Sequence, residues 1–163
     1  GIVASGRQCR LEPVIDGLRF REALQAVLVD GGVSGNVVPD RASVTLNHRF
    51  APDRTPEEAK AWVRSVLAPA LEADDEVELT DAAPAAAPAL DHPVLAALIA
   101  ESGAPVAPKL RWTDVARFAA HGIPAANFGP GEATLAHRAD ERVTRSSVER
   151  CFAALDHLLR TGP

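Results

Sequence analysis

Alternating apolar and polar residues predict a β-hairpin in the first third of the chain. From residue 42 to residue 50 one face carries Val44, Leu46, His48 and Phe50, and the other carries Ser43, Thr45, Asn47 and Arg49. This two-residue period is typical of a half-buried strand. Apolar residues between Arg19 and Asp30 predict its partner, although a helix over residues 21–26 competes with that interpretation. Glycines and Pro39 separate the two segments and predict a turn around residues 36–40.

Apolar residues at helical spacing predict helices in three segments of the chain. Thr55, Pro56 and Glu58 form a capping-box sequence, and apolar residues follow at helical spacing to Leu71. Asp91 is expected to cap a helix over residues 93–101 that ends at Ser102 and Gly103. A second capping box at residues 146–149 predicts a final helix, with one buried face made of Val148, Cys151, Phe152, Leu155, Leu158 and Leu159.

Shorter apolar runs predict further strands. Residues 76–81, 106–110 and 123–128 are the candidates, and the last run is expected to be buried. Between the last two strands, Thr113 and Asp114 are suited to starting a short helix, which Gly122 and Pro124 would end. Residues 82–90, rich in alanine and proline, indicate a crossing between domains. The fold class predicted is α/β, with a split β-α-β unit over residues 12–82 and an α/β half over residues 83–163.

Composition excludes several classes of protein. The net charge of −5 and the pI near 5.5 argue against a nucleic-acid binder, which needs a basic face. No apolar run reaches membrane-spanning length, and no signal peptide is visible. Cys9 and Cys151 show neither metal-binding nor redox spacing. A soluble protein of the reducing cytoplasm is expected.

Three residues in the second half could carry chemistry. His137 lies in a polar stretch beside Glu132, Asp140 and Glu141 and is a candidate metal ligand, because neutral imidazole suits zinc. A loop histidine that hydrogen-bonds locally is the alternative. Thr113 and Arg117 lie one helical turn apart at a helix start and could bind a carboxylate, since arginine grips carboxylates with two parallel hydrogen bonds. A capped surface helix with a solvated arginine is the alternative.

Three motif blocks carry a family resemblance. The blocks WTDVARF, GIPAANFGPG and LAHRADERV resemble the C-terminal part of succinyl-diaminopimelate desuccinylases. Residues 13–59 are similar to the lid domain of the same enzymes. These enzymes belong, with acetylornithine deacetylases, to the dimerising zinc aminoacylase and carboxypeptidase family.

The resemblance implies roles for particular residues. It makes His137 a ligand of one of two zinc ions, for which cobalt could substitute, and it makes Thr113 and Arg117 contacts of a substrate carboxylate. It also implies a homodimer joined through the lid, in which Asn36 reaches the active site of the partner subunit. Arg49 would bind an anionic group of N-succinyl-diaminopimelate, and the role of Asp114 stays open.

The family's other site residues are not recognisable in this sequence. Neither its His-x-Asp block nor its catalytic Glu-Glu pair can be found. The expectation is therefore a C-terminal segment that is inactive alone and binds zinc weakly. An acetylornithine deacetylase or carboxypeptidase of the same family, and a non-catalytic dimerisation module, remain alternatives.

Overall fold

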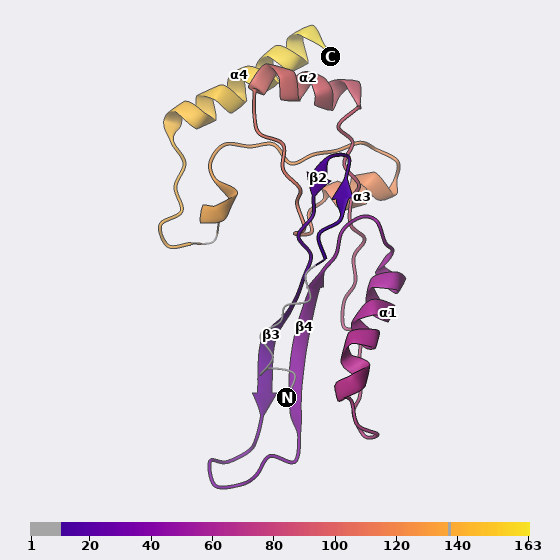
Figure 1. Ribbon diagram of the computed structural model, residues 1–163. Coiled ribbons are helices and arrows are strands. Elements are labelled where there is room, and N and C mark those ends of the chain that lie inside the picture. Colours follow the sequence, from indigo (N-terminus) through magenta and orange to yellow (C-terminus); the bar gives the residue numbers. More distant parts are fainter. Residues whose placement is uncertain (1–10, 137) are drawn as a thin grey trace. The chain divides into compact units, whose positions relative to one another are not determined.

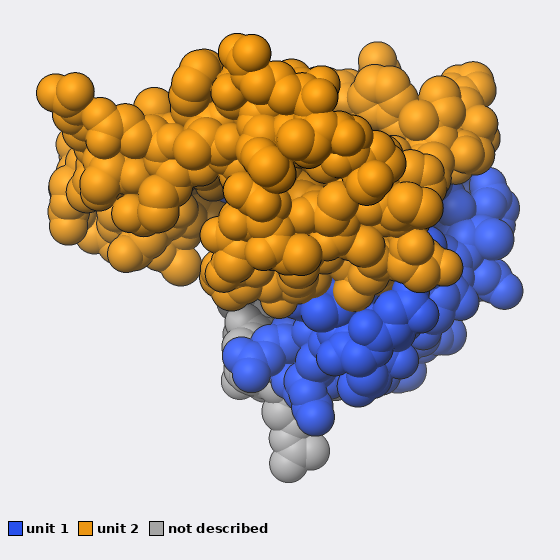
Figure 2. Space-filling view, turned by 90° about the horizontal axis from the view of Figure 1, so that it is seen from above, with its two compact units in different colours: residues 1–87, 108–112 blue, residues 88–107, 113–163 orange. Residues whose placement is uncertain are grey.

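The computed structural model describes residues 11–136 and 138–163. The chain divides into two compact units, coloured separately in Figure 2. Unit 1 comprises residues 1–87 and 108–112, and unit 2 comprises residues 88–107 and 113–163. No helix among the described residues is long and apolar enough to cross a membrane.

Unit 1 is built on two antiparallel hairpins (Figure 1). The small one joins β1 (Val14–Ile15) to β2 (Leu18–Arg19) through Asp16 and Gly17. Both turn residues have positive φ, 49° and 76°, as a type I′ turn requires. The long one pairs β3 (Ala23–Gly31) with β4 (Ala42–Arg49), from Ala23 opposite Arg49 at its base to Gly31 opposite Ala42 at its tip.

The long hairpin confirms the predicted strand pair. The competing helix over residues 21–26 is wrong, because β3 pairs with β4 along its length, a contact that local propensity does not include. An irregularity between Ala26 and Leu28 shifts the register once. Such a bulge changes which face the following side chains occupy.

Helix α1 (Pro56–Leu67) follows the hairpin, and its predicted start is confirmed. The Thr55 side chain accepts a hydrogen bond from the Glu58 backbone N–H, and the Glu58 side chain accepts one from the Thr55 backbone N–H. Ala59 and Leu67 are buried, and a 3-10 turn, η1 (Ala68–Ala70), continues the helix.

The strand predicted over residues 76–81 is wrong. Among the described residues that segment pairs with no strand, and the Arg64 guanidinium donates a hydrogen bond of 2.9 Å to the Val77 carbonyl oxygen. Of the predicted split β-α-β unit, the described part of unit 1 therefore contains the long hairpin and α1, but not the strand over residues 76–81. The mixed α/β class is confirmed.

Unit 2 pairs two helices, α2 (Pro93–Ser102) and α4 (Arg145–Thr161), which lie side by side in Figure 1. His157 Nε2 of α4 lies 3.7 Å from Glu101 Oε2 of α2. Gly103 ends α2 at a φ of 58°, as predicted. The predicted caps are wrong in detail, because His92 occupies the N-cap of α2 and Thr144, whose side chain accepts from the Ser147 N–H, caps α4.

The buried face predicted for α4 is also only partly correct. Ala154 is buried and Leu158 is half-buried, whereas Phe152 and Leu159 are 70% and 85% exposed. The buried residues of α4 therefore lie to one side of the face that the apolar spacing predicts.

Two strands predicted near unit 2 are wrong as well. Residues 106–110 and 123–128 have no ladder partner among the described residues, and Ile123 is half exposed rather than buried. The short helix between them is confirmed as α3 (Val115–Ala120), and Gly122 follows it at a φ of 69°. A 3-10 turn, η2 (Ala133–Leu135), lies further along.

Candidate functional site

Thr113 and Asn127 connect two of the motif blocks. The Asn127 side-chain amide donates a hydrogen bond of 3.2 Å to the Thr113 hydroxyl oxygen. Thr113 is half-buried just before α3, and its carbonyl oxygen accepts the Ala116 N–H at 3.0 Å. The structure therefore brings Asn127, which the sequence did not single out, to the predicted threonine. Its position in the GIPAANFGPG block, the second motif, was the available signal.

Arg117 lies on α3, one turn after Thr113. Its backbone N–H bonds to the Asp114 carbonyl oxygen at 2.9 Å, and its side chain is exposed. Asp114 occupies the N-cap position, but its carboxylate makes no capping hydrogen bond. Arg117 thus lies on α3, whereas Thr113 lies outside the helix, one residue before its N-cap.

The loop around the third motif block forms a hollow of about 240 Å³ within unit 2. It is lined by Pro130, Gly131, Glu132, Glu141, Arg142 and Val143. Asp140, considered above as a neighbour of His137, pairs with Arg138 at 2.9 Å and with Arg142 at 3.8 Å. Its carboxylate is thereby engaged by two guanidinium groups.

A metal site is not complete among the described residues. His137, the predicted ligand, lies outside them. In residues 11–136 and 138–163, no three His, Cys, Asp or Glu side chains lie close enough together to hold a metal ion. Since zinc sites in proteins use three or four protein ligands, the described residues alone do not fit a zinc centre.

Asn36 and Arg49 lie at opposite ends of the long hairpin. Asn36 belongs to the tip loop, where its side-chain oxygen accepts the Ser34 hydroxyl at 2.6 Å. Arg49 is the last residue of β4, and its Nε donates to Asn47 Oδ1 at 3.3 Å. Seven residue steps separate Arg49 from Ala42, roughly 23 Å of strand at about 3.3 Å each, before the tip loop begins. Within one chain, these two residues cannot contact the same small ligand.

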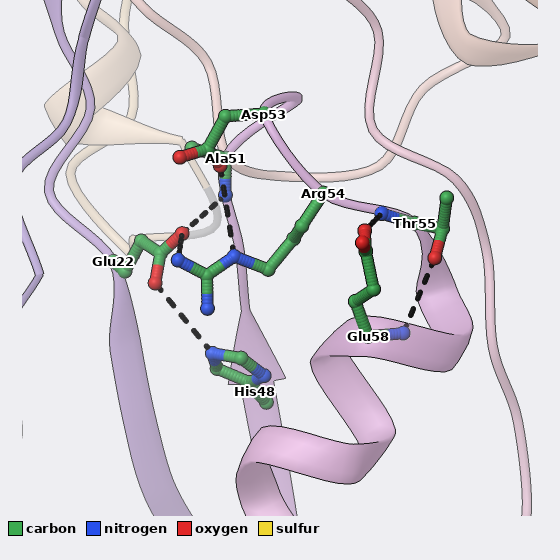
Figure 3. Close-up of polar contacts among 7 residues, drawn as sticks. All are labelled: Glu22, His48, Ala51, Asp53, Arg54, Thr55 and Glu58. Atoms are coloured by element: carbon green, nitrogen blue, oxygen red, sulfur yellow. Dashed lines mark hydrogen bonds and ion pairs between the residues drawn. The ribbon is translucent and has the colours of Figure 1, made fainter.

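A buried polar cluster at the base of the hairpin was not predicted. Glu22 is 1% exposed and lies against His48 and Arg54 (Figure 3). His48 was expected only to pack on an apolar face. The available signal was period two: Glu22 falls on the same side of the chain as Phe20, which is buried.

Comparisons with known proteins agree with the motif blocks. Residues 13–75 match the family model of the peptidase dimerisation domain. The chain is 51% identical over 146 residues to a Mycobacterium tuberculosis protein named as a putative succinyl-diaminopimelate desuccinylase. It is 41% identical over 148 residues to the succinyl-diaminopimelate desuccinylase of Corynebacterium glutamicum, and 30% identical over 138 residues to that of Dinoroseobacter shibae.

These alignments cover most of this chain but a minority of each relative. They include 90%, 89% and 80% of the chain and 40%, 40% and 36% of the respective relatives. The chain thus spans about two fifths of the length of the curated relatives it matches. Over that length it is similar to succinyl-diaminopimelate desuccinylases, and its residues 13–75 match the peptidase dimerisation domain.

Proposed function

We propose that this chain supplies the dimerisation and substrate-carboxylate-binding part of a succinyl-diaminopimelate desuccinylase. Such an enzyme hydrolyses the succinyl amide of N-succinyl-diaminopimelate and releases succinate, a step of lysine and diaminopimelate biosynthesis in the cytoplasm. The observation that carries this proposal is the 51% identity over 90% of the chain. In this proposal residues 12–82 form the lid, and residues 83–163 form the C-terminal part of the catalytic domain.

The proposal assigns anion binding to Thr113, Arg117 and Arg49. Thr113 and Arg117 bind a substrate carboxylate, and the Asn127–Thr113 hydrogen bond supports this role because it orients the threonine hydroxyl. Arg49 binds a second anionic group, because a guanidinium group offers two parallel donors to a carboxylate. Asn36 contributes to the site of the partner subunit, a role supported by its separation from Arg49 along the hairpin.

The proposed enzyme is metal-dependent and uses zinc, or cobalt in its place. The bound metal would polarise the amide carbonyl and activate water. His137 is the proposed ligand from this chain. Because the described residues lack a group of three ligands, no catalytic step is assigned to them.

The proposed assembly is a homodimer joined through the long hairpin. Several valines at its tip and along its strands are exposed, including Val29 at 62% and Val38 at 87%. Exposed apolar patches mark interaction surfaces in many soluble proteins. A second copy of the chain would cover them.

A chimeric enzyme tests this function. In the Mycobacterium tuberculosis relative, the matching segment is replaced by this chain, and succinate release from N-succinyl-diaminopimelate is measured beside turnover of N-acetylornithine. We expect the chimera to hydrolyse the succinyl substrate and to prefer it. Arg117→Lys should lower kcat/KM about 10- to 100-fold, the loss expected when a charged hydrogen bond worth roughly 1.5–3 kcal/mol is removed.

A matched control separates binding from general charge effects. Arg145→Lys alters an exposed arginine that pairs with Glu149 on α4 at 2.7 Å, and it should leave kcat/KM unchanged. Preference for N-acetylornithine would instead favour the deacetylase alternative. A folded, dimeric chimera without amide hydrolysis would favour the non-catalytic dimerisation module, which the match over residues 13–75 also supports.

A further inference from the structure

The base of the long hairpin contains a carboxylate that is almost completely removed from solvent. Glu22 lies between β2 and β3 and is 1% exposed. Its Oε1 accepts the Ala51 backbone N–H at 2.8 Å and lies 3.6 Å from Arg54 Nη2 (Figure 3). Burying an ionised carboxylate is costly unless partners compensate for the lost hydration, so these contacts stabilise Glu22 in place.

The second oxygen of Glu22 faces an imidazole ring. Glu22 Oε2 lies 3.8 Å from His48 Nε2, which is beyond hydrogen-bond distance. The His48 side chain is 8% exposed. Among the described residues, Glu22 Oε2 and both ring nitrogens of His48 have no hydrogen-bond partner.

The same ring joins the hairpin to α1. His48 stacks on Trp62, with ring centroids 4.7 Å apart and an angle of 25° between the planes, and it also contacts Phe50 at 5.7 Å. Trp62 belongs to α1 and His48 to β4. The stack is therefore a direct side-chain contact between the helix and the sheet.

The charged groups around His48 come from two segments. Glu22 precedes β3, and Arg54 precedes α1. Asp53 Oδ1 lies 3.6 Å from Arg54 Nε and shares its charge. The rings of Trp62 and Phe50 also lie against the imidazole and carry no charge.

This environment favours the neutral form of the imidazole. A protonated ring would have two N–H donors, and neither has an acceptor within hydrogen-bond distance among the described residues. Burial lowers the pKa of His48 below its ordinary value of 6.5, and the positive charge of Arg54 lowers the pKa further.

We propose that Glu22, His48 and Arg54, together with the Trp62 ring, form a proton-sensitive latch. It holds α1 against the long hairpin while His48 is neutral and loosens when the ring takes up a proton. The latch depends only on contacts within unit 1, so it stands independently of the proposed enzymatic function.

The direction of the pH effect follows from linkage. Because the pKa of His48 is lower in the folded chain than in the unfolded one, the unfolded chain binds more protons in the interval between the two values. The contribution of the latch is complete above about pH 6.5 and is lost as the pH falls below that value. Within that interval, one proton changes the unfolding constant by up to about tenfold for each pH unit.

Urea unfolding of this chain at pH 7.5 and pH 5.5 tests the latch. His48→Phe keeps a ring against Trp62 but cannot take up a proton. The unfolding constant of the wild type should therefore change more between the two pH values than that of the variant, by a factor of up to about ten. His121→Phe alters an exposed histidine after α3 and is the matched control, which should keep the wild-type pH dependence.

Two readouts on the folded chain do not depend on variant stability. Nuclear magnetic resonance should give His48 a pKa below 6.5. In a Trp112→Phe background, the emission of Trp62 should change with the same midpoint, and His48→Phe should abolish the change. A pKa of 6.5 or higher would mean that attraction to Glu22 and to the Trp62 ring outweighs burial, and it would overturn the proposal. Unchanged pH dependence in a folded His48→Phe variant would overturn it too.

Discussion

The two ends of the long hairpin use the same pair of strands in opposite ways. At the base, Glu22 is 1% exposed and His48 is covered by Trp62 from α1. Toward the tip, Val29 is 62% exposed and Val38 in the loop is 87% exposed. The base thus buries charge, whereas the tip exposes apolar side chains.

The difference shows that alternation along a strand does not decide which residues are buried. Apolar and polar residues alternate on β4, but burial depends on what covers each face. At the base, α1 and the segment before it supply a ring, a guanidinium group and a backbone N–H to the strands. At the tip, the apolar side chains remain available to another molecule, which is why the hairpin is the proposed dimer surface.

Removing the buried carboxylate should break the base of the hairpin. Glu22→Ala leaves the Ala51 N–H without its acceptor and Arg54 without its buried partner. We expect the free energy of unfolding to fall by about 3–5 kcal/mol, as is typical when one member of a buried ion pair is deleted. Urea denaturation followed by circular dichroism measures the loss.

Glu12→Ala is the matched control for that variant. Glu12 also pairs with an arginine, Arg19, at 3.3 Å, but its side chain is 36% exposed. We expect a loss below about 1 kcal/mol, the usual range for exposed pairs. Equal losses in the two variants would show that burial at the base does not distinguish the two carboxylates.

Charges at the tip should separate the proposed dimer. Val29 and Val44 are cross-strand partners, and both are exposed. The double variant Val29→Asp, Val44→Asp should raise the dissociation constant at least about 100-fold, which corresponds to roughly 2.7 kcal/mol. Sedimentation velocity over a range of concentrations measures this change.

Val143→Asp tests whether the effect is specific to the tip. Val143 is 52% exposed but lies in unit 2, outside the hairpin. Its substitution should leave the dissociation constant unchanged. If the wild-type chain sediments as a monomer throughout, the hairpin is not a self-association surface.

The smallest expected effect concerns the start of α1, beside the base. Thr55→Ala removes the hydroxyl that accepts the Glu58 N–H, and it should cost about 1 kcal/mol of unfolding free energy. Ser146→Ala is the matched control, because the Ser146 hydroxyl contacts that of Thr144 on the exposed surface and should matter by less than about 0.5 kcal/mol. Thermal or urea unfolding of both variants distinguishes a capping residue from a neighbouring serine.

The same capping box has its own pH dependence. The pKa of Glu58 lies below its ordinary value of 4.5. The main cause is the hydrogen bond that its carboxylate accepts from the Thr55 backbone N–H, and the Thr55 side chain contributes less. The contribution of Glu58 is therefore complete above about pH 4.5 and is lost as the pH falls below that value. Unfolding between pH 6 and pH 3 should show this loss in the wild type, and Glu58→Gln should remove it.

Local chemistry made several elements predictable. Thr55 and Glu58 each accept the other's backbone N–H at the start of α1, and Pro56 has no N–H that needs a partner. Gly103 and Gly122 end their helices with positive φ, which glycine adopts without a steric penalty. The short helix α3 is also local, and it carries Arg117 of the predicted carboxylate-binding pair, whereas Thr113 precedes its N-cap.

By itself the sequence determined where the hairpin strands and the main helices lie, and its motif blocks indicated the resemblance to succinyl-diaminopimelate desuccinylases that the comparisons support. Only the tertiary structure decided that residues 76–81, 106–110 and 123–128 are not strands, because a strand needs a partner that no local pattern specifies. It also decided that Glu22 is buried beside His48 and that Phe152 on α4 stays exposed. Burial depends on contacts between residues far apart in the chain, and composition and spacing along one segment do not contain them.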